Sequence, residues 1–121
     1  MKICFPSKDT KPDLQSAMDE NFGRAKYYII YDTSEETFTT HKNSYVSDET
    51  CQRTDVIASL GVDVVVSRRL GNRAMEKFSN YGIDVWKADN SSTVQETLNK
   101  FIIGGFFIRQ KPEGCENPVS K

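Results

Sequence analysis

The run Val62-Asp63-Val64-Val65-Val66 places the strongest limit on what this chain of 121 residues can fold into. It is rich in β-branched residues, and its apolar and polar side chains do not alternate, which is the pattern of a central parallel strand covered on both faces. Parallel neighbours are joined by crossover connections that are usually helical. The run therefore predicts an α/β sheet with helices on both of its faces.

The flanking sequences carry the periodicity that such helices need. Apolar residues at positions 56, 57 and 60 mark a short helix closed by Gly61, and those at 70, 74, 78 and 81 mark a second helix that ends at Gly82. Thr93-Val94-Gln95-Glu96 fits a capping box and predicts a third helix that stops at Gly104-Gly105.

Four other segments read as strands, which gives a mixed sheet of five strands in all. Residues 2–5 form a short apolar run stopped by Pro6, residues 27–31 and 37–40 suggest a hairpin, and residues 83–86 follow the second helix. Cys4, on the first strand, is expected in the core. The predicted architecture is a three-layer α/β sandwich with right-handed crossovers.

Length and charge limit the class of protein. The length suits a single domain, which we place at residues 1–108 and follow with a flexible tail at 109–121. A formal net charge of −1 argues against a nucleic-acid binder. No signal peptide or membrane span is recognised. The three cysteines contain no CxxC pair, which favours reduced thiols in a cytoplasmic protein.

Positive charge is concentrated in the loop after the central strand. Residues 61–87 hold five cationic and three acidic residues, and the cations gather at Arg68, Arg69 and Arg73. The loop joins the carboxyl end of that strand to the next helix, which is where α/β sheets bind anions. Gly71 would let an anion approach the backbone closely. The alternative is that this charge run is only a solvated surface.

Metal ligands and catalytic groups have weaker signals. Cys51 precedes the first helix, whose N-terminus would favour its thiolate, and His41, the single histidine, is its candidate partner as a metal ligand. No strand is followed by GxxxxGK[ST] or GxGxxG, and no nucleophile elbow is present. We therefore expect no enzymatic activity.

Several motifs in order resemble one known family. They are Met1-Lys2-Ile3 with Pro6-Ser7, Asn21-Phe22-Gly23-Arg24-Ala25, Asn43, Leu60-Gly61-Val62-Asp63-Val64-Val65, Leu70-Gly71 with Arg73-Ala74, Tyr81-Gly82-Ile83-Asp84-Val85 and Thr93-Val94-Gln95-Glu96. Over about residues 1–107 the chain is similar to the nitrogenase iron-molybdenum cofactor biosynthesis domain family, small proteins that bind or carry metal-sulfur cofactors and their precursors.

The resemblance implies a ribonuclease-H-like fold, generally without catalytic acids. It also implies a core position for Phe22, and Arg24 could turn toward the pocket of Arg68. This chain departs from the family where it carries Arg68 and Arg69 in place of glycines. It also departs at residues 44–53, which include Cys51 in place of a glycine-rich loop with histidine.

The leading hypothesis is a non-enzymatic carrier or assembly protein for an iron-sulfur or molybdenum-iron-sulfur species, bound transiently. Its partner would be a cluster-assembly or cluster-delivery protein, and the chain itself would be a monomer or weak homodimer. Arg24, Arg68, Arg69, Gly71 and Arg73 would bind the anion, because guanidinium groups stay charged and donate to sulfide or oxo acceptors. Cys51 and His41 would ligate the metal.

Two other functions stay open from the sequence. Phe106-Phe107-Ile108 and the tail would serve a protein-interaction or regulatory module, since three consecutive apolar residues are costly to expose. A small hydrolase would use Cys51 as its nucleophile.

Overall fold

The computed structural model describes residues 1–9, 13–43, 52–89, 93–105 and 107–110. Along the chain these residues form one short 3-10 helix (η1), three α-helices and six strands. In order, the elements are β1 (Lys2–Ser7), η1 (Phe22–Arg24), β2 (Tyr27–Asp32), β3 (Thr37–Lys42), α1 (Gln52–Ser59), β4 (Val64–Ser67), α2 (Asn72–Asn80), β5 (Asp84–Lys87), α3 (Val94–Ile103) and β6 (Ile108–Gln110).

The strands form one mixed sheet in the order β3-β2-β1-β4-β5-β6. β1, β4 and β5 run parallel to one another, while β2, β3 and β6 are antiparallel to their neighbours. The expected hairpin and the central parallel strand are both present. The prediction of five strands is wrong, because the described residues contain a sixth strand, β6.

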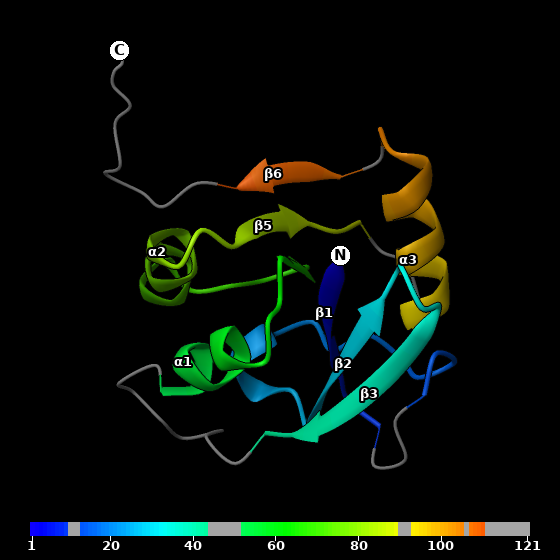
Figure 1. Ribbon diagram of the computed structural model, residues 1–121, viewed down its shortest axis with the longest axis horizontal. Helices are drawn as coiled ribbons and strands as arrows, with labels where there is room; N and C mark the ends of the chain where they lie inside the picture. Colours follow the sequence, from blue (N-terminus) through cyan, green and yellow to red (C-terminus); the bar gives the residue numbers. More distant parts are fainter. Residues whose placement is uncertain (10–12, 44–51, 90–92, 106, 111–121) are drawn as a thin grey trace.

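Two apolar clusters fill the space on the two sides of the sheet. Figure 1 shows α1 and α2 on one side and α3 on the other. β4 contributes Val65 to the cluster that contains Ile57 of α1 and Phe78 of α2, and it contributes Val64 and Val66 to the cluster of α3. The mixed α/β arrangement thus has helices on both faces, and its ribonuclease-H-like assignment stays a prediction from the resemblance.

Helix α3 begins as the capping box predicts. The hydroxyl of Thr93 accepts a hydrogen bond from the amide of Glu96 at 3.1 Å, and Thr93 has an extended backbone. This bond satisfies one of the amide groups that the first turn of a helix leaves without a partner. Val94 and Leu98 then bury their side chains against the sheet.

The end of the described chain belongs to the sheet. β6 pairs with β5, and the Arg109 guanidinium donates to Asp84 at 2.7 Å. Phe107 is buried in the cluster of α3, whereas Ile108 is exposed. Strand β6 thus includes the first two residues of the predicted tail, and residues 111–121 lie outside the described part of the chain. Within that part, no helix is both long enough and apolar enough to cross a membrane.

The side chain of Asn43 holds η1 against the sheet. Asn43 is 6% exposed, and its amide group donates to the carbonyl oxygens of Gly23 at 3.1 Å and Ala25 at 2.9 Å. The Tyr28 hydroxyl donates to the carbonyl of Phe22 at 2.6 Å, and Phe22 lies fully buried between the rings of Tyr28 and Phe78. The predicted core position of Phe22 is therefore correct.

We predict that Asn43→Ala lowers the free energy of unfolding by about 2 to 4 kcal/mol, because it leaves the carbonyl groups of Gly23 in η1 and of Ala25 just after η1 without this donor. Urea denaturation followed by circular dichroism measures the change. The control is Asn80→Ala at the exposed end of α2, which is expected to change stability by less than about 0.5 kcal/mol. Equal stabilities of the Asn43 and Asn80 variants would contradict this role of Asn43.

We predict that the Cys4 thiol reacts only when the protein unfolds. Cys4 is fully buried, and burial raises the pKa of its thiol well above the ordinary value of 9.0. Above pH 9.0 the thiol therefore ionises in the unfolded chain before it does in the folded protein. The free energy of unfolding is unaffected by Cys4 below that pH and falls as the pH rises above it. In a Cys51→Ser, Cys115→Ser variant, a disulfide reagent should label Cys4 at the rate of unfolding. Rapid labelling in native buffer would refute the prediction.

Candidate functional site

The carboxyl ends of the parallel strands meet at one edge of the sheet. Ser67 ends β4 and Lys87 ends β5, and the two residues are partners in the parallel register. The amide of Ala88 donates to the carbonyl of Ser67 at 2.9 Å, which keeps the two chain segments together just past the strands. This edge of an open α/β sheet is the usual place for ligands.

Two hydrogen bonds fix the arginine-containing loop that leaves β4. The Ser67 hydroxyl and the Phe22 amide both donate to the carbonyl oxygen of Arg69, each at 3.0 Å. The second bond places η1, which ends at Arg24, directly beside the loop. The structure thus brings together the backbone segments that carry Arg24 and Arg69. The side chain of Arg24 is exposed.

The loop ends at the N-terminus of α2, whose N-cap residue makes no side-chain hydrogen bond to the helix. Gly71 is the N-cap residue, with φ −64° and ψ 151°, so its own backbone does not require glycine. A Cβ atom built on Gly71 would meet nothing within 4 Å. The first amide groups of α2 therefore lack a side-chain acceptor from the N-cap, and a helix N-terminus in this state attracts anions.

A cavity of about 170 Å³ lies between this loop and β5 and β6. Arg68, Arg69 and Lys87 line it, and no carboxylate is found among the described residues that surround it. The other lining residues are Ser67, Leu70, Met75, Val85 and Gln110. Three cationic residues next to a helix N-terminus whose N-cap is glycine make this cavity suitable for a small anion.

The remaining predicted anion-binding residues, Arg24, Gly71 and Arg73, do not line this cavity. Arg73 is exposed in the first turn of α2, and Arg24 is exposed at the end of η1. Arg68 and Arg69 thus form the part of the predicted cluster that a ligand in the cavity would meet first.

The two predicted metal ligands are not brought together by the described residues. Cys51 lies outside them. His41 lies on β3 and lines a different cavity, whose described lining includes none of the four arginines. Among the residues that the structure describes, no group of three His, Cys, Asp or Glu side chains is placed to hold a metal ion. The ligand roles of Cys51 and His41 stay predictions.

The sequence analysis did not predict that Lys87 and Gln110 line the cavity at the carboxyl edge. Lys87 follows a strand expected to be parallel to β4, so the rule that placed the arginines at the carboxyl edge could have placed Lys87 there as well. Gln110 had no comparable signal, because its segment read as part of the tail. It reaches the cavity only because β6 pairs with β5.

Comparisons with known proteins agree on the fold. The chain is 25% identical over 113 residues to an uncharacterised protein of Methanocaldococcus jannaschii, covering 86% of this chain and 87% of that protein. It is similar to the solution structure of a NifB-like protein from Thermotoga of the DUF35 family, with a TM-score of 0.75, 28% identity and coverage of 85% and 88%.

A second solved structure shares the fold at lower sequence identity. The apo form of the orange protein from Desulfovibrio gigas has a TM-score of 0.76 and 21% identity, with coverage of 84% of this chain and 87% of that one. Residues 1–104, nearly all of the predicted domain, match the model of one protein family. The chain therefore belongs to the dinitrogenase iron-molybdenum cofactor family.

Proposed function

We propose that this protein is a non-catalytic carrier or assembly protein for an anionic metal-sulfur cofactor or its precursor. The observation that carries the proposal is the cationic cavity at the carboxyl edge, lined by Arg68, Arg69 and Lys87 beside the N-terminus of α2. Membership of the iron-molybdenum cofactor family supports an iron-molybdenum or related cargo.

The chemistry of the cavity suits release as well as binding. Arginine donates hydrogen bonds to sulfide or oxo groups and does not compete for the metal, so it holds a cluster by its outer anionic atoms. At about 170 Å³ the cavity is small, and residues of the loop after β4 form much of its lining. A cargo held by outer-atom contacts can pass to a delivery partner without breaking metal-protein bonds at the arginines.

We predict that Arg68→Gln with Arg69→Gln weakens tetrathiomolybdate binding about tenfold or more, because two charge-assisted contacts are lost. Anaerobic titration monitored by absorbance measures the affinity. The matched control is Lys8→Gln with Lys42→Gln, which removes the same charge from exposed positions outside the cavity. If the control weakens binding as much as the arginine variant, only overall charge matters and the cavity proposal fails.

We predict that Cys51 and His41 supply direct metal ligands. After anaerobic reconstitution with iron and sulfide, Cys51→Ala and His41→Ala should each lower the bound iron and sulfide, and the double variant should lower both most. Cys115→Ala is the matched thiol control. Iron and sulfide contents that match wild type in the double variant would show that neither residue is a ligand, and would leave the arginine contacts to be judged by the titration.

A further inference from the structure

Strand β3 forms one edge of the sheet, and no described residue pairs with its outer side. It is six residues long and pairs with β2 along its whole length without a bulge. Proteins usually protect such an edge, because its unpaired backbone groups can add another strand. The opposite edge, β6, is protected by its length of only three residues. β3 contains no proline, and its one lysine stands at its last position.

One hydrogen bond shows which backbone groups of β3 face outward. The amide of Asn43, just after the strand, donates to the carbonyl of Lys26 at 3.0 Å. In an antiparallel pair, residues alternate between bonding to the neighbouring strand and facing away from it. Every second residue counted back from Asn43 therefore bonds to β2. The others direct their N–H and C=O groups away from the sheet: Phe38, Thr40 and Lys42.

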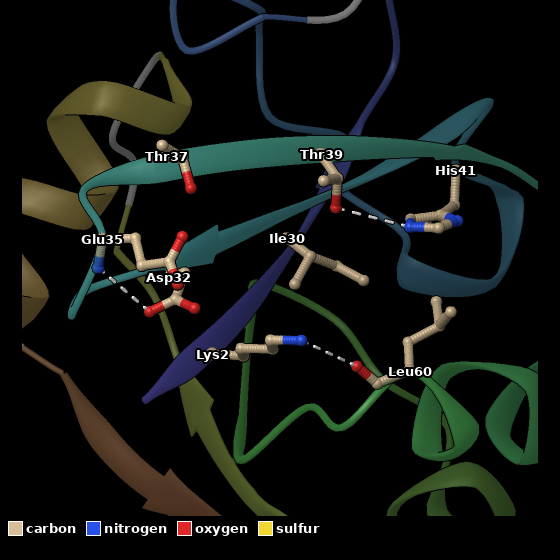
Figure 2. Close-up of a pocket in the computed structure, with 8 residues that line it drawn as sticks. All are labelled: Lys2, Ile30, Asp32, Glu35, Thr37, Thr39, His41 and Leu60. Atoms are coloured by element: carbon tan, nitrogen blue, oxygen red, sulfur yellow. Dashed lines mark hydrogen bonds between the residues drawn. The ribbon is translucent and has the colours of Figure 1, made fainter.

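Both faces of β3 are open as well as its edge. Five of its six residues are exposed, so the helices do not cover this strand. Figure 2 shows the side chains of Thr37, Thr39 and His41 on one side of β3, along the cavity of about 380 Å³. Phe38 lies on the other side, across from Tyr31, and is 38% exposed. A strand added at this edge would remove apolar surface of Phe38 from water, which is favourable.

Symmetry limits how two copies of β3 could pair. Copies related by a two-fold axis run antiparallel, and each hydrogen-bonded pair between them joins two residues whose backbone groups face outward. Since outward-facing residues alternate along β3, one residue must lie opposite its own copy. The register centred on Thr39 places Glu36, just before each strand, opposite Lys42 of the other copy. Registers centred on Phe38 or Thr40 do not place these two charges opposite each other.

Glu36 and Lys42 can form such a pair across the two copies. Both are exposed, and neither belongs to an ion pair within the described residues. Opposite charges directly across neighbouring strands stabilise their pairing. The two-fold axis gives this pair twice, once at each end of the contact. This charge complementarity identifies a second copy of the chain as the occupant of the edge.

The inner residues fit the same register. Phe38 lies opposite Thr40 of the other copy, and the two Phe38 residues are diagonal neighbours about 7 to 8 Å apart, within reach of aromatic side chains. On the other face the two Thr39 side chains meet at the axis, and threonine pairs are favourable across strands. The contact thus covers the exposed aromatic ring and matches polar groups with polar groups.

We propose that two copies of this chain pair antiparallel along β3, in the register centred on Thr39, and join their sheets into one. Backbone hydrogen bonds between Phe38 and Thr40 hold the two strands, and Glu36 of each copy meets Lys42 of the other. The contact is a single strand pair, so the dimer is weak and dissociates on dilution. The interface does not depend on the proposed carrier function, because the cationic cavity lies beside β5 and β6.

Sedimentation equilibrium over a range of protein concentrations tests the charge pairs. Lys42→Glu and Glu36→Lys should each raise the dissociation constant of the dimer about tenfold or more, because both attractive pairs become repulsive. The combined variant restores unlike charges and should return the constant to within about threefold of wild type. The matched control is Glu76→Lys, which makes the same charge change at an exposed position of α2 and should leave the dimer unchanged.

Cysteine cross-linking tests the register. In the Cys51→Ser, Cys115→Ser background, Thr39→Cys places two thiols opposite each other with Cα atoms about 4.5 Å apart, within the range of a disulfide. Thr40→Cys is the matched control, because its two copies are diagonal neighbours about 7 to 8 Å apart. Under mild oxidation, a linked dimer should form faster from Thr39→Cys, as measured on a non-reducing gel.

Four outcomes overturn the proposal. It fails if the protein sediments as a monomer up to about 1 mM, or if Lys42→Glu and Glu76→Lys have equal effects. It also fails if the combined charge variant does not recover, or if Thr40→Cys cross-links as fast as Thr39→Cys. Arg68→Gln with Arg69→Gln should leave the dimer unchanged, so failure of the carrier proposal and failure of this one are distinguishable.

Discussion

β4 sends Val65 into the apolar cluster beneath α1 and α2, and it sends Val64 and Val66 into the cluster beneath α3. β1 does the same with Cys4 between Ile3 and Phe5. Each such side chain stabilises the fold by about 1.5 to 3 kcal/mol when fully buried. Because both faces of the central strands are covered by apolar groups, burying an unpaired charge there would cost much free energy. The polar chemistry of the protein is therefore confined to the edges and the outer hairpin.

At the carboxyl edge, hydrogen bonds hold η1 and the loop after β4 in fixed positions. The side-chain amide of Asn43 donates to the carbonyl groups of Gly23 and Ala25, and the backbone amide of Phe22 donates to the carbonyl of Arg69. Phe22 and Arg69, far apart in the sequence, thus meet at this edge through a hydrogen bond between their backbones. The backbone that carries Arg69 is thereby held in place, and a fixed backbone is one part of the preorganisation that favours binding.

The two cavities differ in electrostatic character, and the difference follows from the strands that line them. The cavity at the carboxyl edge has Arg68, Arg69 and Lys87 and no described carboxylate. The lining of the cavity beside β3 includes the carboxylates of Asp32 and Glu35 as well as the Lys2 side chain. The charged residues of the first lining are all cationic, whereas those of the second carry both signs. The two sites therefore suit different ligands.

Much of the fold was available from the sequence because it rests on local patterns. The β-branched run at Val64–Val66, the capping box at Thr93 and the apolar stripe of α2 each report their own secondary structure and their buried face. The sixth strand was missed because Ile108–Gln110 is short, largely exposed and polar at its end, so its pattern does not differ from that of a tail. Only pairing with β5 makes it a strand.

The sequence by itself determined the α/β architecture, the buried position of Cys4 and the placement of the arginines after a strand, since each depends on neighbouring residues along the chain. The tertiary structure alone decided that Gln110 joins Arg68 and Arg69, and that His41 shares a cavity with Lys2 and Asp32. The physical reason is that strand order and register set which distant side chains meet. Those are fixed by burial of the whole sheet, which no local pattern encodes.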